Sequence, residues 1–211
     1  MSVTYGPGIT ECLYAMPVKG PAGVSTTNCL TLANAGTASG GAYQLPANYF
    51  SYPGTGGPGR SLLIKGGGYW SEGGTANTLT FSCNLDTTAG TALAGGLLGS
   101  TGAITPVAST SGIFDFEILV TATASGVSAG VLQTVGHLNI GAVTTLNAQT
   151  ATLGTFSAGT NLNTLALGGV NAGLASFNTQ QAYWVEFFGN WSATTNAPSV
   201  TLSNFYVFGT N

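Results

Sequence analysis

The amino-acid sequence predicts an all-β protein, a jelly-roll-like antiparallel β-sandwich with an extended N-terminal arm. Segments in which apolar and polar residues alternate recur roughly every 10–15 residues, and Gly, Ser, Thr and Asn fill the intervals between them. No window combines a 3.6-residue hydrophobic period with helix-capping residues. Many short strands separated by such turns are typical of sandwiches and jelly rolls.

The arm is predicted from the distribution of proline. Six of the eight prolines fall in the first 60 residues. Proline removes a backbone donor and restricts the residue before it, so this region should be extended, with one or two short strands at most. We therefore assign residues 1–57 to the arm and residues 58–211 to the sandwich. Residues 43–50 are apolar enough to pack on the domain or on a neighbouring subunit.

The clearest predicted strand covers residues 112–124. Its alternation places one set of side chains on one face: Phe114, Phe116, Ile118 and Val120. The opposite face carries Asp115, Glu117, Leu119 and Thr121. In residues 77–85 the apolar face consists of Leu79, Phe81, Cys83 and Leu85.

Further strands are predicted along the rest of the chain, at residues 61–65 and 69–70, 131–140, 143–146, 150–156 and 162–167. The three glycines at 66–68 indicate a bulge or a close approach of two backbones. The last two strands, 182–191 and 199–208, are expected to pair with each other, and residues 93–98 could form one helical turn.

Charged residues are scarce. The chain of 211 residues has three Lys and Arg and six Asp and Glu, so 4% of it is charged, against about 25% in a typical soluble domain. A neutral, hydrogen-bonding surface loses little solvation when a partner covers it, so the composition favours a component of an assembly. A net charge of −3 without a basic patch argues against nucleic-acid binding. No run of 18 apolar residues and no signal peptide is present, so we expect no membrane association.

The same scarcity predicts that the protein is not an enzyme. Asp115 and Glu117 share a strand face and could meet Glu186 as a carboxylate pair, but no glycosidase signature surrounds them. His137 is the only histidine and has no predicted orienting partner. We therefore expect no catalytic residues; Asp115 and Glu117 fit a solvated or subunit-contacting face, paired with Lys65 or Arg60.

Cofactor and metal sites are not expected either. Glycines 54, 56 and 59 match a G-x-G-x-x-G pattern, but Pro58 interrupts it and a strand follows in place of a helix. The three cysteines lack C-x-x-C spacing. They fit reduced, buried thiols, and a Cys12–Cys29 disulfide stays open as an alternative.

Aromatic residues occupy both faces of the strand at 182–191, which indicates either a central strand covered on both sides or a face that meets another subunit. The candidate subunit-contact residues are Tyr49, Phe50, Arg60, Trp184, Glu186 and Phe188. A second interpretation makes Trp70, Trp184 and Trp191 a platform for sugar rings, although each also fits a core position.

Residues 58–211 also resemble a known family in the order of five short sequence segments: 58–64 (PGRSLLI), 78–81 (TLTF), 102–105 (GAIT), 116–121 (FEILVT) and 199–207 (SVTLSNFYV). This order is similar to that of jelly-roll structural proteins of tailed bacteriophages, of the capsid decoration or cement type. The resemblance implies a virion protein, made in the host cytoplasm, that forms a homotrimer on the capsid surface and binds the major capsid protein. A carbohydrate-binding or tail-associated module of the virion is the alternative.

Overall fold

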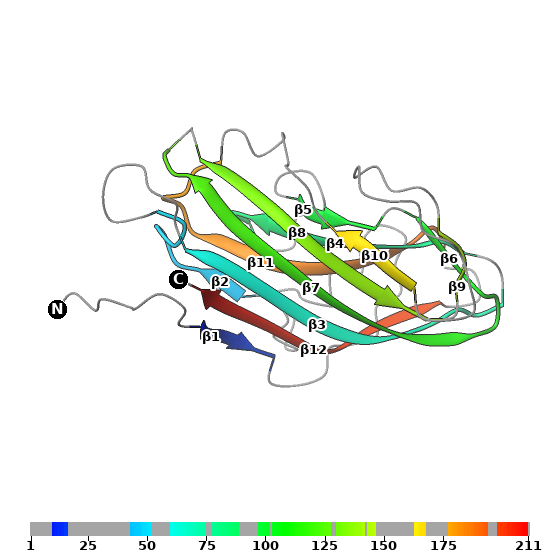
Figure 1. Ribbon diagram of the computed structural model, residues 1–211. Coiled ribbons are helices and arrows are strands. Elements are labelled where there is room, and N and C mark those ends of the chain that lie inside the picture. Colours follow the sequence, from blue (N-terminus) through cyan, green and yellow to red (C-terminus); the bar gives the residue numbers. More distant parts are fainter. Residues whose placement is uncertain are drawn as a thin grey trace.

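The computed structural model describes residues 10–16, 43–51, 60–74, 77–88, 97–101, 103–127, 130–141, 143–146, 163–167, 177–193 and 198–210. Within these residues every regular element is a strand, and the strands form two antiparallel sheets that pack as a sandwich (Figure 1). This confirms the predicted all-β fold class.

The first sheet, sheet A, has six strands in the order β1-β12-β3-β7-β8-β10. Their bounds are Thr10–Ala15, Ser199–Thr210, Ser61–Ser71, Ser111–Ala124, Val131–Ile140 and Asn163–Leu167. Figure 1 shows these strands side by side along the length of the molecule.

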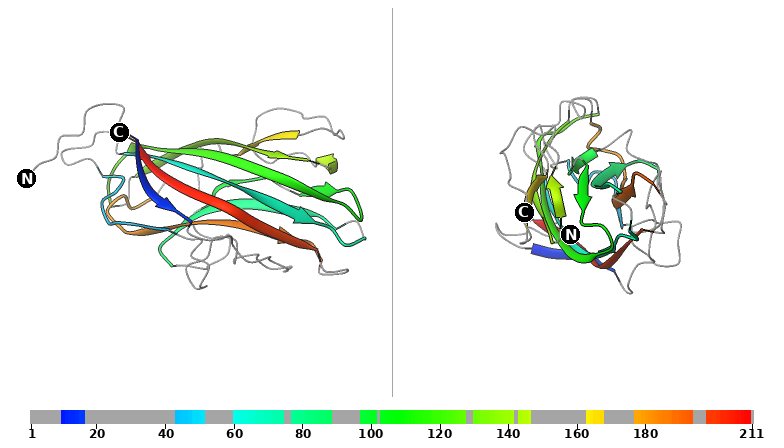
Figure 2. Two further views of the ribbon diagram at one scale, coloured as in Figure 1. Left: turned by 90° about the horizontal axis from the view of Figure 1, so that it is seen from below. Right: turned by 90° about the vertical axis from the view of Figure 1, so that its right-hand side faces the viewer.

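The second sheet, sheet B, runs β2-β11-β4-β6-β9, and β5 pairs with β4 beside this path. The bounds in that order are Tyr43–Leu45, Tyr183–Trp191, Leu79–Asp86, Ile104–Pro106 and Val143–Leu146, with Leu97–Ser100 for β5. Seen end-on in Figure 2, the two sheets curve around a common interior.

The hydrophobic core lies between the sheets and follows the predicted alternation. The predicted inward faces of β7 and β4 are buried, and on β8 Leu132, Leu138 and Ile140 are completely so. Aromatic rings from the two sheets meet in the middle, where Phe116 of β7 stacks on Phe187 of β11. Burial of this kind contributes roughly 1.5–3 kcal/mol for each large side chain.

The glycines of β3 mark a close approach of backbones, as predicted. A Cβ atom at Gly68 would overlap the carbonyl oxygen of Thr201 on β12, and one at Gly66 would lie 2.6 Å from the Phe116 ring. The strand itself continues without interruption, and the bulge lies in its neighbour β12, where the register shifts between Leu202 and Asn204.

Two predictions of local structure are wrong. The strands β11 and β12 do not pair with each other, because β11 lies between β2 and β4 in sheet B while β12 lies between β1 and β3 in sheet A. The end of the segment predicted as a helical turn is a strand, because Leu97 and Leu98 belong to β5, which pairs with β4; residues 93–96 lie outside the described residues. The predicted strand at 150–156 lies outside the described residues.

The described parts of the predicted arm belong to the sandwich. Strand β1 pairs with β12 at the edge of sheet A, and β2 pairs with β11 at the edge of sheet B. Leu45, Tyr49 and Phe50 are part of the core. The boundary at residue 57 therefore does not separate an arm from an independent domain.

Candidate functional site

One face of the sandwich combines apolar side chains with exposure to solvent. It is the outer face of sheet A, made by alternate residues of β12, β3, β7 and β8 that point away from the core. Among the described residues six large hydrophobic side chains are exposed, and five of them lie on this face: Tyr69, Ile113, Leu119, Val135 and Tyr206. The sixth, Val127, follows β7 in the turn toward β8. Exposed apolar residues gathered on one face mark interaction surfaces.

The register of the strands arranges this face in rows. One row is apolar throughout and consists of Phe208, Leu63, Leu119 and Val135. The next outward-facing row along the strands is polar and consists of Tyr206, Lys65, Glu117 and His137. Toward the other end of the strands, Tyr69 of β3 lies opposite Ile113 of β7. Apolar rows thus flank a polar centre.

The charges at this centre are paired. Lys65 Nζ lies 2.7 Å from Glu117 Oε2. The two side chains are 44% and 42% exposed, respectively. Asn139 Nδ2 donates a hydrogen bond of 2.8 Å to Asp115 Oδ2. An exposed ion pair contributes only about 0–1 kcal/mol to stability, so these contacts set the pattern of charge on the face more than they hold the fold.

The structure does not bring the three candidate carboxylates together. Phe116 and Phe187 meet in the core, and the neighbouring residues of each strand therefore point to opposite outer surfaces. Asp115 and Glu117 lie on the outer face of sheet A, whereas Glu186 lies on the far side of sheet B. His137 is in register with Glu117, also on the outer face of sheet A.

Four of the six predicted subunit-contact residues are buried in the chain itself, which corrects the expected surface position. Tyr49, Phe50, Glu186 and Phe188 have exposed fractions of 5%, 1%, 0% and 1%. Strand β11 is central and covered on both faces, as the first of the two interpretations expected. Glu186 and Phe188 point away from the core and are nonetheless shielded from solvent.

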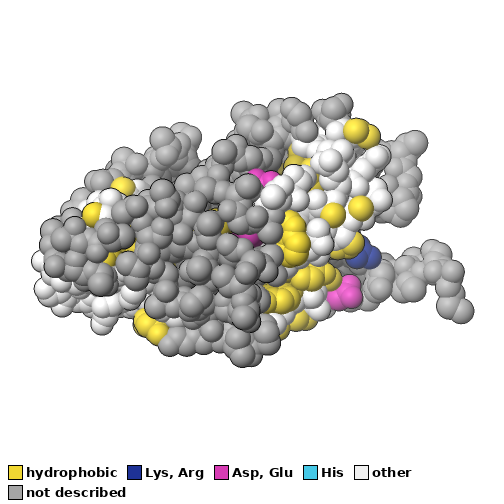
Figure 3. All heavy atoms as spheres, turned by 180° about the vertical axis from the view of Figure 1, so that it is seen from behind, with side chains coloured by type: hydrophobic (Ala, Val, Ile, Leu, Met, Phe, Trp, Pro, Cys, Tyr) yellow, Lys and Arg dark blue, Asp and Glu magenta, His cyan; other side chains and the backbone are white. Residues whose placement is uncertain are grey.

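Trp184 and Arg60 remain partly exposed. The tryptophan platform for sugars is not formed, because Trp70 and Trp191 are completely buried. Seen from behind in Figure 3, the described atoms carry few charged side chains, in keeping with the composition.

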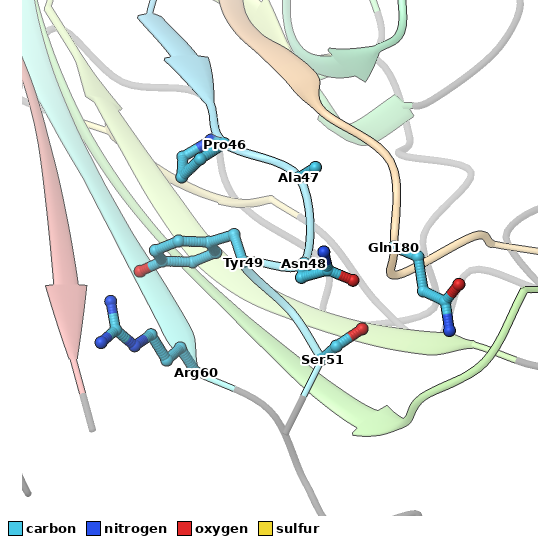
Figure 4. Close-up of a pocket in the computed structure, with 7 residues that line it drawn as sticks. All are labelled: Pro46, Ala47, Asn48, Tyr49, Ser51, Arg60 and Gln180. Atoms are coloured by element: carbon cyan, nitrogen blue, oxygen red, sulfur yellow. The ribbon is translucent and has the colours of Figure 1, made fainter. Parts of the chain in front are cut away.

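A pocket of about 530 Å³ lies beside β2 and the start of β3 (Figure 4). Its described lining residues are Pro46, Ala47, Asn48, Tyr49, Ser51, Arg60 and Gln180. The guanidinium carbon of Arg60 is 5.8 Å from the centre of the Tyr49 ring. The Tyr49 hydroxyl donates a 3.0 Å hydrogen bond to the carbonyl oxygen of Ser61. Burial raises the pKa of this phenol, and Arg60 offsets the effect only in part.

This pocket offers amides, hydroxyls and one guanidinium, which are groups that bind a ligand. Its described lining contains neither a carboxylate nor a histidine, so these residues supply no general acid–base pair.

A buried carboxylate that the sequence analysis overlooked joins two loops. Glu72, which is 2% exposed, accepts hydrogen bonds from the backbone N–H groups of Gly74 at 3.1 Å and Ser109 at 3.0 Å. It also accepts one from Asn77 Nδ2 at 3.2 Å. In the sequence, the only local indication of this site is a glutamate that directly follows a strand and precedes Gly73-Gly74.

The thiol of Cys12 is exposed and that of Cys83 is buried, while Cys29 lies outside the described residues. Within the described ranges, no three His, Cys, Asp or Glu side chains are grouped so that they could hold a metal ion. The part of the chain that the structure describes also contains no helix long and apolar enough to span a membrane.

No protein-family model matches the chain, and no curated protein matches it in sequence.

Proposed function

We propose that this chain is a non-enzymatic structural protein of a tailed-bacteriophage virion, of the capsid decoration or cement type, which stabilises the shell by bridging capsomers. The observation that carries the proposal is the outer face of sheet A, which gathers five of the six exposed large hydrophobic side chains of the described residues. A face of this kind is stabilised when another protein covers it.

The low charge of the chain supports the same proposal. Only 4% of the residues are charged. On the outer face Glu117 forms an ion pair with Lys65, and Asp115 accepts a hydrogen bond from Asn139. Covering the face therefore removes water from few unpaired charges, so one of the costs of forming an interface, the desolvation of charged groups, stays small.

The proposal predicts that the protein is a stoichiometric part of purified particles. Mass spectrometry of phage particles from a lysate of cells carrying this gene should detect it at a fixed ratio to the major capsid protein. Particles assembled without it should lose DNA at a lower temperature, and addition of the purified protein should restore their resistance. Its absence from the particles would overturn the proposal.

The tail-associated alternative is distinguished by fractionation. A decoration protein remains with isolated heads, and a tail module remains with isolated tails. The carbohydrate-binding alternative has lost its main support, because the side chains of Trp70 and Trp191 lie in the core.

A further inference from the structure

The geometry points to a second copy of this chain as the occupant of the outer face of sheet A, in a face-to-face pair related by a twofold axis. This inference rests on the proposed function, in which the chain works inside an assembly. It goes further, because it names the partner of one particular face, and it replaces the homotrimer that the resemblance implies with a twofold pair.

The strand register makes the face complementary to itself. Consider a twofold axis that runs along the strands, between β3 and β7, in the plane where two such faces meet. This axis exchanges β3 with β7 and β12 with β8, the strands that flank them in the sheet. Each residue of β3 then lies opposite its cross-strand partner on β7 of the second copy, and each residue of β12 lies opposite the β8 residue of the same row.

The charges match under this operation. Lys65 and Glu117 are cross-strand partners, so Lys65 of each copy meets Glu117 of the other, and four charges of alternating sign come together. Asp115 is the partner of Gly67, so each Asp115 faces a residue without a side chain, and no like charges are directly opposed.

The apolar rows also match. Leu63 meets Leu119 of the second copy, since these residues are partners in the register of β3 and β7. For the same reason Tyr69 meets Ile113. Phe208 on β12 and Val135 on β8 lie at the two ends of the row that contains Leu63 and Leu119. The axis therefore places Phe208 of one copy opposite Val135 of the other.

The area is sufficient for a specific interface. Four strands about 4.8 Å apart, each about ten residues long at roughly 3.3 Å per residue, cover about 600 Å². A pair would bury about 1,200 Å² in total, at the lower end of the range for stable interfaces. In such a pair each surface outside the shared interface is present once on each copy. One pair can therefore bind two capsomers through the same surface of its two copies.

The test uses charge reversal in the full-length protein. Wild type should sediment at twice the 21.0 kDa of one chain. Lys65→Glu and Glu117→Lys should each raise the dissociation constant about tenfold or more, because each brings like charges together across the pair. A mixture of the two variants should restore a pair, since each acidic variant then faces a basic one.

Val127→Lys, on an exposed residue outside the face, should leave the mass of the pair unchanged, and circular dichroism should show that all variants are folded. A wild-type monomer or trimer would overturn the inference, as would a mixture that fails to associate. A monomer whose face variants no longer attach to particles would identify the capsid protein as the occupant. Detection of the chain in virions is independent of all these outcomes, so the proposed function can stand or fall separately.

Discussion

The ring of Phe116 on β7 stacks on the ring of Phe187 on β11, with the two centroids 3.8 Å apart and the planes 5° from parallel. This contact joins the centres of the two sheets. It also decides which residues face outward, because Asp115, Glu117 and Glu186 are the chain neighbours of the two rings.

We expect Phe116→Leu and Phe187→Leu each to lower the free energy of unfolding by about 1–3 kcal/mol. The loss of unfolding free energy in the double variant should be smaller than the sum of the two single losses, by about 0.5–1.5 kcal/mol, because either substitution alone already removes the stacking. Urea unfolding of the four chains measures this coupling. Phe116→Leu combined with Val127→Ala, a distant exposed site, should be additive; equal additivity in both pairs would contradict the importance of the stack.

Glu72 offers a test of the buried hydrogen-bond network. Glu72→Gln keeps the shape but places an amide donor among backbone donors, and should lower the free energy of unfolding by about 2 kcal/mol. Asp86→Asn is the matched control, since Asp86 Oδ1 accepts a 3.1 Å hydrogen bond from the N–H group of Thr88 at an exposed site. Its cost should stay below about 1 kcal/mol. Equal costs in thermal unfolding would show that the Glu72 contacts do not stabilise the fold.

Removing residues 1–57 should prevent folding, contrary to what an independent arm predicts. The deletion takes Leu45, Tyr49 and Phe50 from the core and uncovers the edge of β11. Removing residues 1–16 deletes only β1 among the described elements and should leave a folded but less stable chain. Near-UV circular dichroism distinguishes the two; a cooperative, wild-type melting curve for the longer deletion would restore the arm as a separate unit.

The buried thiol of Cys83 should make the folded protein less stable at alkaline pH. Burial raises the pKa of its thiol above the ordinary value of 9.0, and the nearby Glu186 acts in the same direction. The folded chain therefore keeps a proton that the unfolded chain releases above pH 9. Stability from this group is fully present below pH 9 and falls by about 1.4 kcal/mol for each pH unit above it.

The measurement is the difference in free energy of unfolding between wild type and Cys83→Ala from pH 7 to pH 10.5. The difference should be constant up to about pH 9 and then shift against wild type, while the tyrosines affect both chains alike. A difference that does not change with pH would mean that the thiol ionises as freely in the folded chain as in the unfolded one.

Local pattern predicted the strands and their inward faces because a strand alternates its side chains with a period of two. Phe114, Phe116, Ile118 and Val120 could be assigned to the core on this basis alone. The close approach at Gly68 was also predictable, since consecutive glycines are rare inside strands without such a reason.

The choice of strand partners could not be predicted in this way. Strand β11 pairs with β4, about 100 residues earlier in the chain, and not with the adjacent β12. Glu186 and Phe188, two of the residues expected at a subunit contact, are buried on the side of β11 that points away from the core. The Glu72 site depends equally on distant residues, because Ser109 reaches it only through the fold.

A cryo-electron microscopy map of the virion would show whether the protein bridges capsomers. We expect density for the two-sheet sandwich on the capsid, in contact with two capsomers, with the outer face of sheet A covered by protein. A map in which the capsid surface has no such density, or in which this face of the bound sandwich is open to solvent, would contradict it.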